Sequence, residues 1–234
     1  MKISKTILLL HVLVGVSTLA GCAEGPFWRL GRYSPWATQK WSEEEQLANT
    51  LFEQKKEMNE WVAAVSDRSA TEQNEAASKL ADIALRNPVL LVRLQAVRKL
   101  GELNCPNSQA ALRQAYSDPD ASVRLAVVEA WRKMSDDVAV PELQKILGSD
   151  TNIDVRLAAT KALGDFPGSQ SVSALRLALT DPDPAIRRRG TQSMARVTGE
   201  SFGADIRKWQ NYANQIVGDS QRIAQQDSNN VTTR

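Results

Sequence analysis

A five-residue segment recurs along the chain, as VRLQA at 92–96, VRLAV at 123–127, VRLAA at 155–159 and IRRRG at 186–190. The arginines of successive copies are 31, 32 and 31 residues apart, at Arg93, Arg124, Arg156 and Arg187. A large apolar residue follows seven residues after each arginine, at Leu100, Trp131, Leu163 and Met194. Apolar positions thus recur at helical intervals, and each copy is predicted to be an amphipathic helix. A fixed period of this length predicts a fold of stacked structural repeats.

The start of each repeated helix is predicted from a second pattern. Six residues before each arginine stands an amide or an acid, at Asn87, Asp118, Asp150 and Asp181. Proline follows three of them, at Pro88, Pro119 and Pro182. An Asn or Asp at the N-cap accepts a hydrogen bond from a backbone N–H group that has no helical partner, and proline suits the first helical position because it has no N–H to leave unpaired. We therefore expect these four residues to be N-caps.

A second apolar-periodic stretch precedes each of these starts, near 75–86, 108–117, 140–148 and 171–180. Each repeat is therefore predicted to be a helical hairpin, with an outer helix, a tight turn and an inner helix that carries the Val-Arg pair. The recurring Asp-Pro, Val-Arg and Leu-Gly pairs resemble those of HEAT repeats, especially the short bacterial type of phycobilisome-lyase-like proteins. The resemblance implies an all-α fold: a right-handed α-solenoid of about four HEAT-like hairpins over residues 70–199, with a capping helix at each end.

Two roles are open for the four repeated arginines. Each arginine stands six residues after the Asn or Asp of its own repeat, which on a helix means about 9 Å of rise and a different face. An ion pair between the two residues of one repeat is therefore unfavourable. Stacking brings equivalent positions of adjacent repeats side by side. We therefore expect the arginines to form a partly buried structural ladder between repeats. The alternative is a row of anion-binding groups on the inner face.

The segments that flank the repeats are expected to close the solenoid or to link it to a membrane. Residues 35–66 and 202–218 have apolar residues at helical spacing and are predicted to be the N- and C-terminal capping helices. The tail at 219–234 is polar and is predicted to be disordered. Residues 22–34 form an aromatic-rich linker, whose rings either pack on the solenoid or contact lipid.

The N-terminus has the pattern of an export signal. Lys2 and Lys5 flank the start of an apolar run at 7–19 that is too short to span a bilayer. The run ends in LAGC at 19–22, which resembles the lipobox of bacterial lipoproteins. The resemblance implies that the signal peptide at 1–21 is removed, and that acyl chains such as palmitate on Cys22 anchor the chain in the cell envelope, facing the periplasm or the exterior. Ala23 favours the outer membrane where the host has one.

Composition excludes several chemistries for the exported chain. The sequence has 29 Lys and Arg against 27 Asp and Glu, and the excess of two is removed with Lys2 and Lys5. The one histidine, His11, lies in the signal, and Cys105 is the one cysteine besides Cys22. A chain without imidazole has few ligands for zinc or iron and no Ser-His or Cys-His pair for nucleophilic catalysis. We therefore expect no catalytic residue, no cofactor and no metal.

The sequence favours a non-enzymatic protein-interaction scaffold, because a solenoid of hairpins exposes an elongated surface that suits a protein partner. The partner itself is not indicated. An enzyme of the bilin-lyase type is the alternative. Chemistry of the deoxyhypusine-hydroxylase type also occurs on similar repeats, but it needs His ligands. Nucleic-acid binding is disfavoured, because Arg187, Arg188 and Arg189 form a single basic cluster in a neutral chain.

Overall fold

The structure is a computed structural model that describes residues 35–232, with side chains described for residues 50–220 and for Arg222 and Gln226. The expected signal peptide at 1–21, the lipidation site Cys22 and the linker at 22–34 lie outside the described residues. The chain divides into two compact units, residues 1–53 and 54–234. The second unit contains all of the predicted repeats.

The described part of the chain is entirely helical. Helix α2 (Pro35–Val65) comes first, and α11 (Ile206–Thr232) comes last. Between them lie four hairpins. Their outer helices are α3 (Ala70–Arg86), α5 (Pro106–Ala115), α7 (Asp136–Ser149) and α9 (Ser169–Leu179). Their inner helices are α4 (Leu90–Leu100), α6 (Ala121–Trp131), α8 (Ile153–Leu163) and α10 (Pro184–Thr198).

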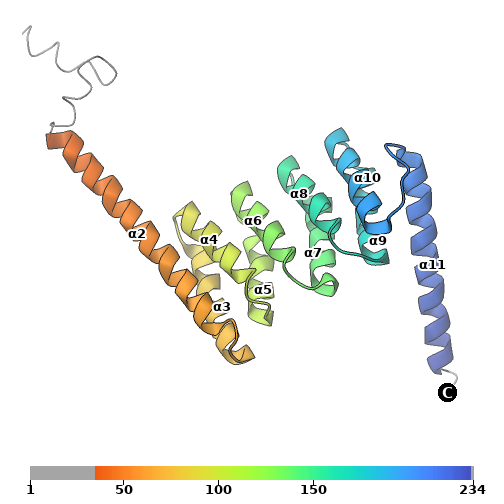
Figure 1. Cartoon of the computed structure of the whole chain (residues 1–234), viewed down its shortest axis with the longest axis horizontal. Helices are drawn as coiled ribbons and strands as arrows, with labels where there is room; N and C mark the ends of the chain where they lie inside the picture. The colour runs from red at the N-terminus through yellow and green to blue at the C-terminus, as the bar shows by residue number, and fades with distance from the viewer. Residues whose placement is uncertain (1–34, 233–234) are drawn as a thin grey trace, which may run out of the picture. The chain divides into compact units, whose positions relative to one another are not determined.

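The four hairpins stack in two layers within the second unit. The inner helices α4, α6, α8 and α10 pack side by side in chain order, and the outer helices lie behind them in Figure 1. Helix α11 continues the outer layer by packing against α9. Each helix contacts only its own and the neighbouring repeats, which is the arrangement of a solenoid. The predicted all-α solenoid of helical hairpins is confirmed.

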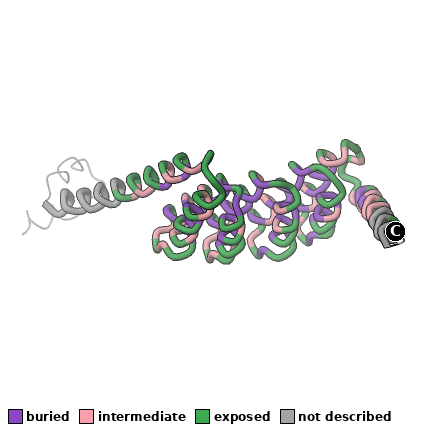
Figure 2. Tube along the Cα trace, turned by 90° about the horizontal axis from the view of Figure 1, so that it is seen from below, coloured by how far each residue is buried: buried purple, intermediate pink, exposed green. Residues whose placement is uncertain are grey.

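The core lies between the two layers and is built from the positions that repeat in the sequence (Figure 2). The residue before each repeated arginine is at most 4% exposed, at Val92, Val123, Val155 and Ile186. The large residues seven positions after the arginines are also buried, at Leu100, Trp131, Leu163 and Met194. Burial of one such side chain stabilises a fold by about 1.5–3 kcal/mol. The positions that repeat in the sequence are therefore the positions whose side chains form the core.

Two glycines allow successive inner helices to approach closely. A Cβ atom on Gly101, at the end of α4, would lie 2.7 Å from the Cα atom of Ala130 in α6. A Cβ atom on Gly164, at the end of α8, would lie 2.8 Å from the Oγ atom of Ser193 in α10. The same serine donates a 2.8 Å hydrogen bond to the carbonyl oxygen of Thr160 in α8. The two Leu-Gly pairs thus permit the close approach of α4 to α6 and of α8 to α10.

Helices at both ends bury apolar side chains. Within the second unit, α2 contributes Met58 and Val62, which are 2% and 4% exposed. In α11, Trp209 is buried, and its ring centroid lies 4.8 Å from that of Phe202 in an edge-on arrangement. The aromatic pair fixes the turn between α10 and α11.

Helix α11 continues to Thr232, into the stretch at 219–234 that was predicted to be disordered. Ser220 donates a hydrogen bond to the carbonyl oxygen of Ile216, and Arg222 pairs with Asp219 at 3.0 Å one turn earlier. Local pairs of this kind support a polar helix. No helix in residues 35–232 is both long enough and apolar enough to cross a bilayer.

Candidate functional site

The four residues expected to be N-caps lie two residues before the actual caps, so this prediction was wrong. The N-caps of α6, α8 and α10 are Asp120, Asn152 and Asp183, and that of α4 is Val89. Pro88, Pro119 and Pro182 accordingly lie outside the helices, and Pro184 holds the first helical position of α10. The residues Asn87, Asp118, Asp150 and Asp181 occupy the turns between the two helices of each hairpin.

The physical reason is a second turn that precedes each cap. The Oδ1 atom of Asp118 accepts a 2.8 Å hydrogen bond from the backbone N–H of Asp120. Asp120 then caps α6 by accepting from the N–H of Ser122 at 2.7 Å. The same pair of turns is found at Asp150 with Asn152 and at Asp181 with Asp183. An acidic or amide side chain often forms such a turn with the backbone two residues on. The recurring second Asp or Asn was the signal that could have placed the caps.

Three of the repeated arginines each bind the aspartate of the next repeat with two nitrogens. The Nε atom of Arg93 lies 2.8 Å from Asp118 Oδ2, and its Nη2 atom lies 3.3 Å from Asp118 Oδ1. Arg124 pairs with Asp150 at 2.8 and 3.1 Å, and Arg156 pairs with Asp181 at 3.0 and 3.4 Å. We call these three ion pairs the ladder. Fork-to-fork pairing is the strong form of the Arg–carboxylate interaction.

The third nitrogen of each ladder arginine holds the turn of its own repeat. The Nη1 atom of Arg124 donates to the carbonyl oxygens of Asp118 and Pro119, at 2.9 and 3.1 Å. Arg93 and Arg156 make the equivalent bonds to the carbonyls five and six residues before them. One guanidinium therefore joins two successive turns, a role that sequence reasoning missed because it considered only side-chain partners.

Ladder carboxylates are almost fully buried, and their charges are held by the arginines. The side chain of Asp150 is 2% exposed, and that of Arg124 is 14% exposed. Burial opposes ionisation of Asp150, but hydrogen bonds from Arg124 and from the N–H of Asn152 outweigh it and keep the pKa of Asp150 below its usual value. The hydrogen bond to Asp150 in turn raises the pKa of Arg124. Both groups stay charged at neutral pH.

Arg187 forms hydrogen bonds with the turn of its own repeat but takes part in none of the ladder ion pairs. Its Nη1 atom donates to the carbonyl oxygens of Asp181 and Pro182, at 2.8 and 2.7 Å. No described carboxylate lies within ion-pair distance of this arginine, which is half-buried. The structure thus brings three of the four predicted ladder arginines against aspartates and leaves the fourth without one.

A second chain of ion pairs joins the other ends of the inner helices, which the sequence pattern did not indicate. Arg132 contacts Asp165 of the next repeat at 2.6 Å, and Arg196 contacts the same carboxylate at 2.5 Å. Within the first repeat, Lys99 pairs with Glu102 at 2.8 Å. The carboxylates of these pairs are more exposed than the ladder aspartates, so each pair contributes little to stability.

The inner helices carry apolar side chains that are not fully buried. We call five of them the leucine row; it consists of Leu91, Leu94, Leu125, Ile153 and Leu157. Leu91 is 62% exposed and Ile153 is 38% exposed, and the other three are half-buried. The exposed residues Arg98, Glu129 and Lys161 lie one turn after Leu94, Leu125 and Leu157, on the same faces.

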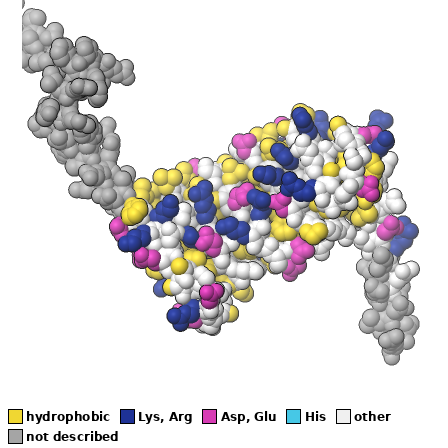
Figure 3. All heavy atoms as spheres, viewed as in Figure 1, with side chains coloured by type: hydrophobic (Ala, Val, Ile, Leu, Met, Phe, Trp, Pro, Cys, Tyr) yellow, Lys and Arg dark blue, Asp and Glu magenta, His cyan; other side chains and the backbone are white. Residues whose placement is uncertain are grey.

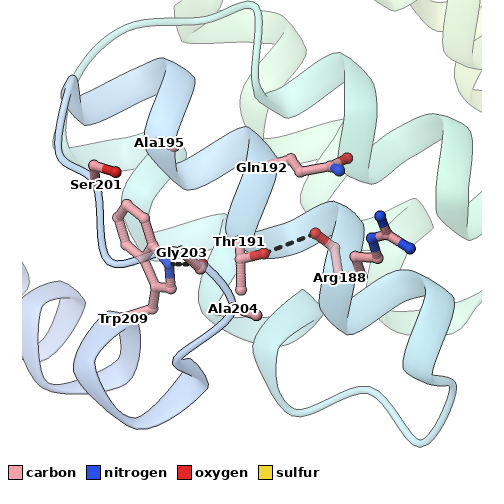
Figure 4. A pocket seen from close by; sticks show the side chains of 8 residues that line it. All are labelled: Arg188, Thr191, Gln192, Ala195, Ser201, Gly203, Ala204 and Trp209. Atoms are coloured by element: carbon pink, nitrogen blue, oxygen red, sulfur yellow. Dashed lines mark hydrogen bonds between the residues drawn. The ribbon is translucent and has the colours of Figure 1, made fainter.

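The row does not continue onto α10, where Arg188 takes the place of the leucine. Lys and Arg side chains gather on this part of the face, over α8 and α10 (Figure 3). Arg188 and Gln192 point to the same side of α10 in Figure 4. They line an open hollow of about 250 Å³ that Trp209 closes on one side. The face is thus apolar over three repeats and basic over the fourth.

Cys105 and the acids are the described side chains of a type that could bind a metal ion. Cys105 is buried at the start of α5, and its Sγ atom lies 3.7 Å from the carbonyl oxygen of Gln73. Among described residues, no three His, Cys, Asp or Glu side chains come together in a group that could hold a metal.

A comparison with curated protein sequences gives no match. Human deoxyhypusine hydroxylase in complex with glycerol is a similar solved structure, with 23% identity and a TM-score of 0.47. The match covers 53% of this chain and 44% of that protein, so the chain spans under half of its length.

The family model for HEAT repeats matches residues 77–164 and 140–206. Together these two ranges cover more than half of the 234 residues. They contain the ladder, the Leu-Gly contacts and all four repeated arginines. The chain therefore belongs to the HEAT-repeat family.

Proposed function

We propose that this chain is a non-enzymatic scaffold that binds a protein partner and is tethered to the bacterial cell envelope through a lipid on Cys22. The observation that carries the proposal is the leucine row on α4, α6 and α8. Solenoids use their extended surfaces for binding, and the row places two exposed and three half-buried apolar side chains on neighbouring inner helices.

The partner that suits this surface is a protein segment with apolar side chains at regular intervals. Leu94, Leu125 and Leu157 occupy equivalent positions on neighbouring inner helices, which pack at about 8–10 Å from one another. An amphipathic helix lying across the inner helices presents apolar residues every three or four positions, at about 5 Å. Alternate turns of such a helix would therefore meet successive members of the row.

The residue content of the exported chain supports a scaffold role over an enzymatic one. The hollows along the described solenoid are open to solvent, and polar and apolar side chains mix in their linings. The exported chain would contain no histidine, since His11 lies in the expected signal. General acid–base catalysis most often uses that residue.

The binding surface can be tested by photocrosslinking in intact cells from a probe at Lys161, which is exposed beside Leu157. We expect one protein to be captured, and we expect capture to be lost in Leu157→Asp. Leu177→Asp is the matched control, because Leu177 is 40% exposed on the outer helix α9. Capture that persists in Leu157→Asp, or that is lost equally in Leu177→Asp, would show that the leucine row is not the binding surface.

The anchor is proposed from LAGC at 19–22 and is tested separately. In Cys22→Ser we expect loss of labelled palmitate and release of the protein from membranes on cell fractionation. Two acyl chains or more give stable anchoring, where one chain gives only marginal binding. Labelled palmitate that remains on Cys22→Ser would overturn the lipid anchor and leave the scaffold proposal to the crosslinking result.

A further inference from the structure

Arg187 holds the same position in its repeat as the three ladder arginines. Its Nη1 atom binds the carbonyl oxygens of Asp181 and Pro182, as Arg124 binds those of Asp118 and Pro119. The two carbonyls fix one edge of the guanidinium. In the ladder, the opposite edge, formed by Nε and Nη2, holds a carboxylate.

At Arg187 no carboxylate of the described chain fills that edge, and the reason lies in the chain path. Ladder partners are 25 or 26 residues apart in sequence. The residues 25 or 26 positions after Arg187 lie inside α11, which begins at Ile206. In the first three repeats, the residue at this separation is the aspartate of the next turn. The fourth repeat therefore has an arginine that is placed for a carboxylate but has no following turn to supply one.

The open edge of Arg187 is not fully enclosed. Its hydrogen bonds to described residues all come from Nη1. Arg187 is half-buried, and among described residues Ser171 Oγ is the one fully buried side-chain nitrogen or oxygen atom without a hydrogen-bond partner. A ligand would meet a guanidinium whose orientation is already fixed, so little side-chain entropy is lost on binding.

The surroundings favour an anion. Arg188 and Arg189 follow Arg187 on α10, and neither forms an ion pair with a described carboxylate. The ladder shows which anion fits a guanidinium in this orientation. In each of its three ion pairs, the Nε and Nη2 atoms of the arginine bind a planar carboxylate. A second copy of this chain is a poor source, since the first repeat has Asn87 where the others have aspartate.

We propose that Arg187 is a binding site for a carboxylate of the partner protein, so that an acidic side chain from outside completes a fourth ion pair. The inference rests on the proposed scaffold function, because it requires a polypeptide partner. The partner is then a segment with apolar residues over α4, α6 and α8 and an acidic residue at α10.

The proposal is tested by NMR on the full chain labelled with ¹⁵N in its arginines, by following the Nε–H signals. The probe is a synthetic amphipathic helical peptide with a leucine at every fourth position and two aspartates at one end. We expect the Arg187 signal, assigned by its absence in Arg187→Lys, to shift on titration while the Arg156 signal stays, because Asp181 already fills that edge. Arg187→Gln should weaken binding at least about tenfold.

Control peptides separate this inference from the scaffold proposal. A peptide with asparagines in place of the two aspartates should bind at least about tenfold more weakly and leave the Arg187 signal unmoved. Equal binding of both peptides, or equal shifts at Arg156 and Arg187, would overturn the carboxylate site. A larger shift with inorganic phosphate than with the acidic peptide would overturn it as well. If Leu157→Asp abolishes peptide binding while Arg187→Gln leaves it unchanged, the scaffold proposal is supported and the Arg187 site is rejected.

Discussion

The first three repeats and the fourth use the same arginine differently. Arg93, Arg124 and Arg156 each join their own turn to the aspartate of the next repeat, so their charge serves the stacking of the solenoid. Arg187 is fixed by its own turn but has no following acidic turn. A repeated residue thus serves the fold where a next repeat exists, and it becomes available for binding where the array ends.

The largest expected difference is between loss of a ladder arginine and loss of the unpaired one. Arg156→Ala should lower the free energy of unfolding by about 2–4 kcal/mol, because it leaves the buried charge of Asp181 without its partner. Arg187→Ala removes only two hydrogen bonds to carbonyls and should cost about 1 kcal/mol. Urea unfolding of both variants measures the difference. Equal losses would mean that the ladder contributes no more than the bonds to the turn.

The Leu-Gly contacts extend the same comparison to packing. Gly101→Ala would place a Cβ atom 2.7 Å from the backbone of Ala130 and should cost about 1–3 kcal/mol. The control is Gly148→Ala, whose Cβ atom would meet only the Leu177 side chain at 3.4 Å. This control should be neutral or slightly stabilising, because alanine is the better helix former. A melting temperature of Gly101→Ala at or above that of wild type would show that the repeats can separate freely.

The equivalent position differs in the other two repeats. Eight residues after the repeated arginine stand Gly101 and Gly164 in the first and third repeats, but Arg132 in the second and Ala195 in the fourth. Ala195 lines an open hollow, and Arg132 pairs with Asp165 of the next repeat. The close approach at this position is therefore specific to the two repeats that have glycine.

The sequence was sufficient for the parts of the fold that depend on local period. Helical periodicity placed all eight hairpin helices, and the recurring Val-Arg pair located the core, because burial follows the side of the helix on which a residue lies. The helix starts were misplaced by two residues, since both Asp118 and Asp120 are good capping residues and only the path of the turn decides between them.

The candidate sites were less accessible to sequence reasoning because they depend on how repeats face one another. The contact between Arg132 and Asp165 joins residues 33 positions apart, and Arg132 stands where the first and third repeats have glycine. The leucine row is likewise hidden, because Leu125 follows the helical period as a core residue would and is only half-buried in the structure. The helical tail of α11 was missed because a polar composition does not by itself predict disorder when local side-chain pairs support a helix.

A smaller effect distinguishes the cap from the ladder residue within one turn. Asp120→Ala should cost about 1 kcal/mol, and Asp120→Asn should be nearly neutral, because asparagine caps a helix as well as aspartate does. Asp118→Asn should cost more than Asp120→Asn, since it removes the charge that Arg93 binds. Thermal unfolding of the three variants gives the order. Equal losses from the two asparagine variants would contradict the assignment of separate roles.

The smallest effect is the dependence of the ladder on pH, which Arg187 should lack. The pKa of Asp150 is lower in the folded chain than its usual value, as hydrogen bonds from Arg124 overcome the effect of burial. An aspartate in an unfolded chain has a pKa of about 3.9. The stabilisation from this carboxylate is therefore complete above about pH 5 and is lost as the pH falls through the folded-state pKa.

Comparison of two arginine variants isolates this contribution. The loss of unfolding free energy in Arg124→Ala should be constant between about pH 5 and 7 and should shrink below about pH 4, because protonated Asp150 no longer needs a cation. The loss in Arg187→Ala should not change over the same range, since its bonds go to carbonyl oxygens that do not titrate. Urea unfolding at several pH values measures both losses. A pH-dependent loss in Arg187→Ala would mean that this arginine binds a carboxylate of its own chain, and a pH-independent loss in Arg124→Ala would mean that the charge of Asp150 contributes nothing to the ladder.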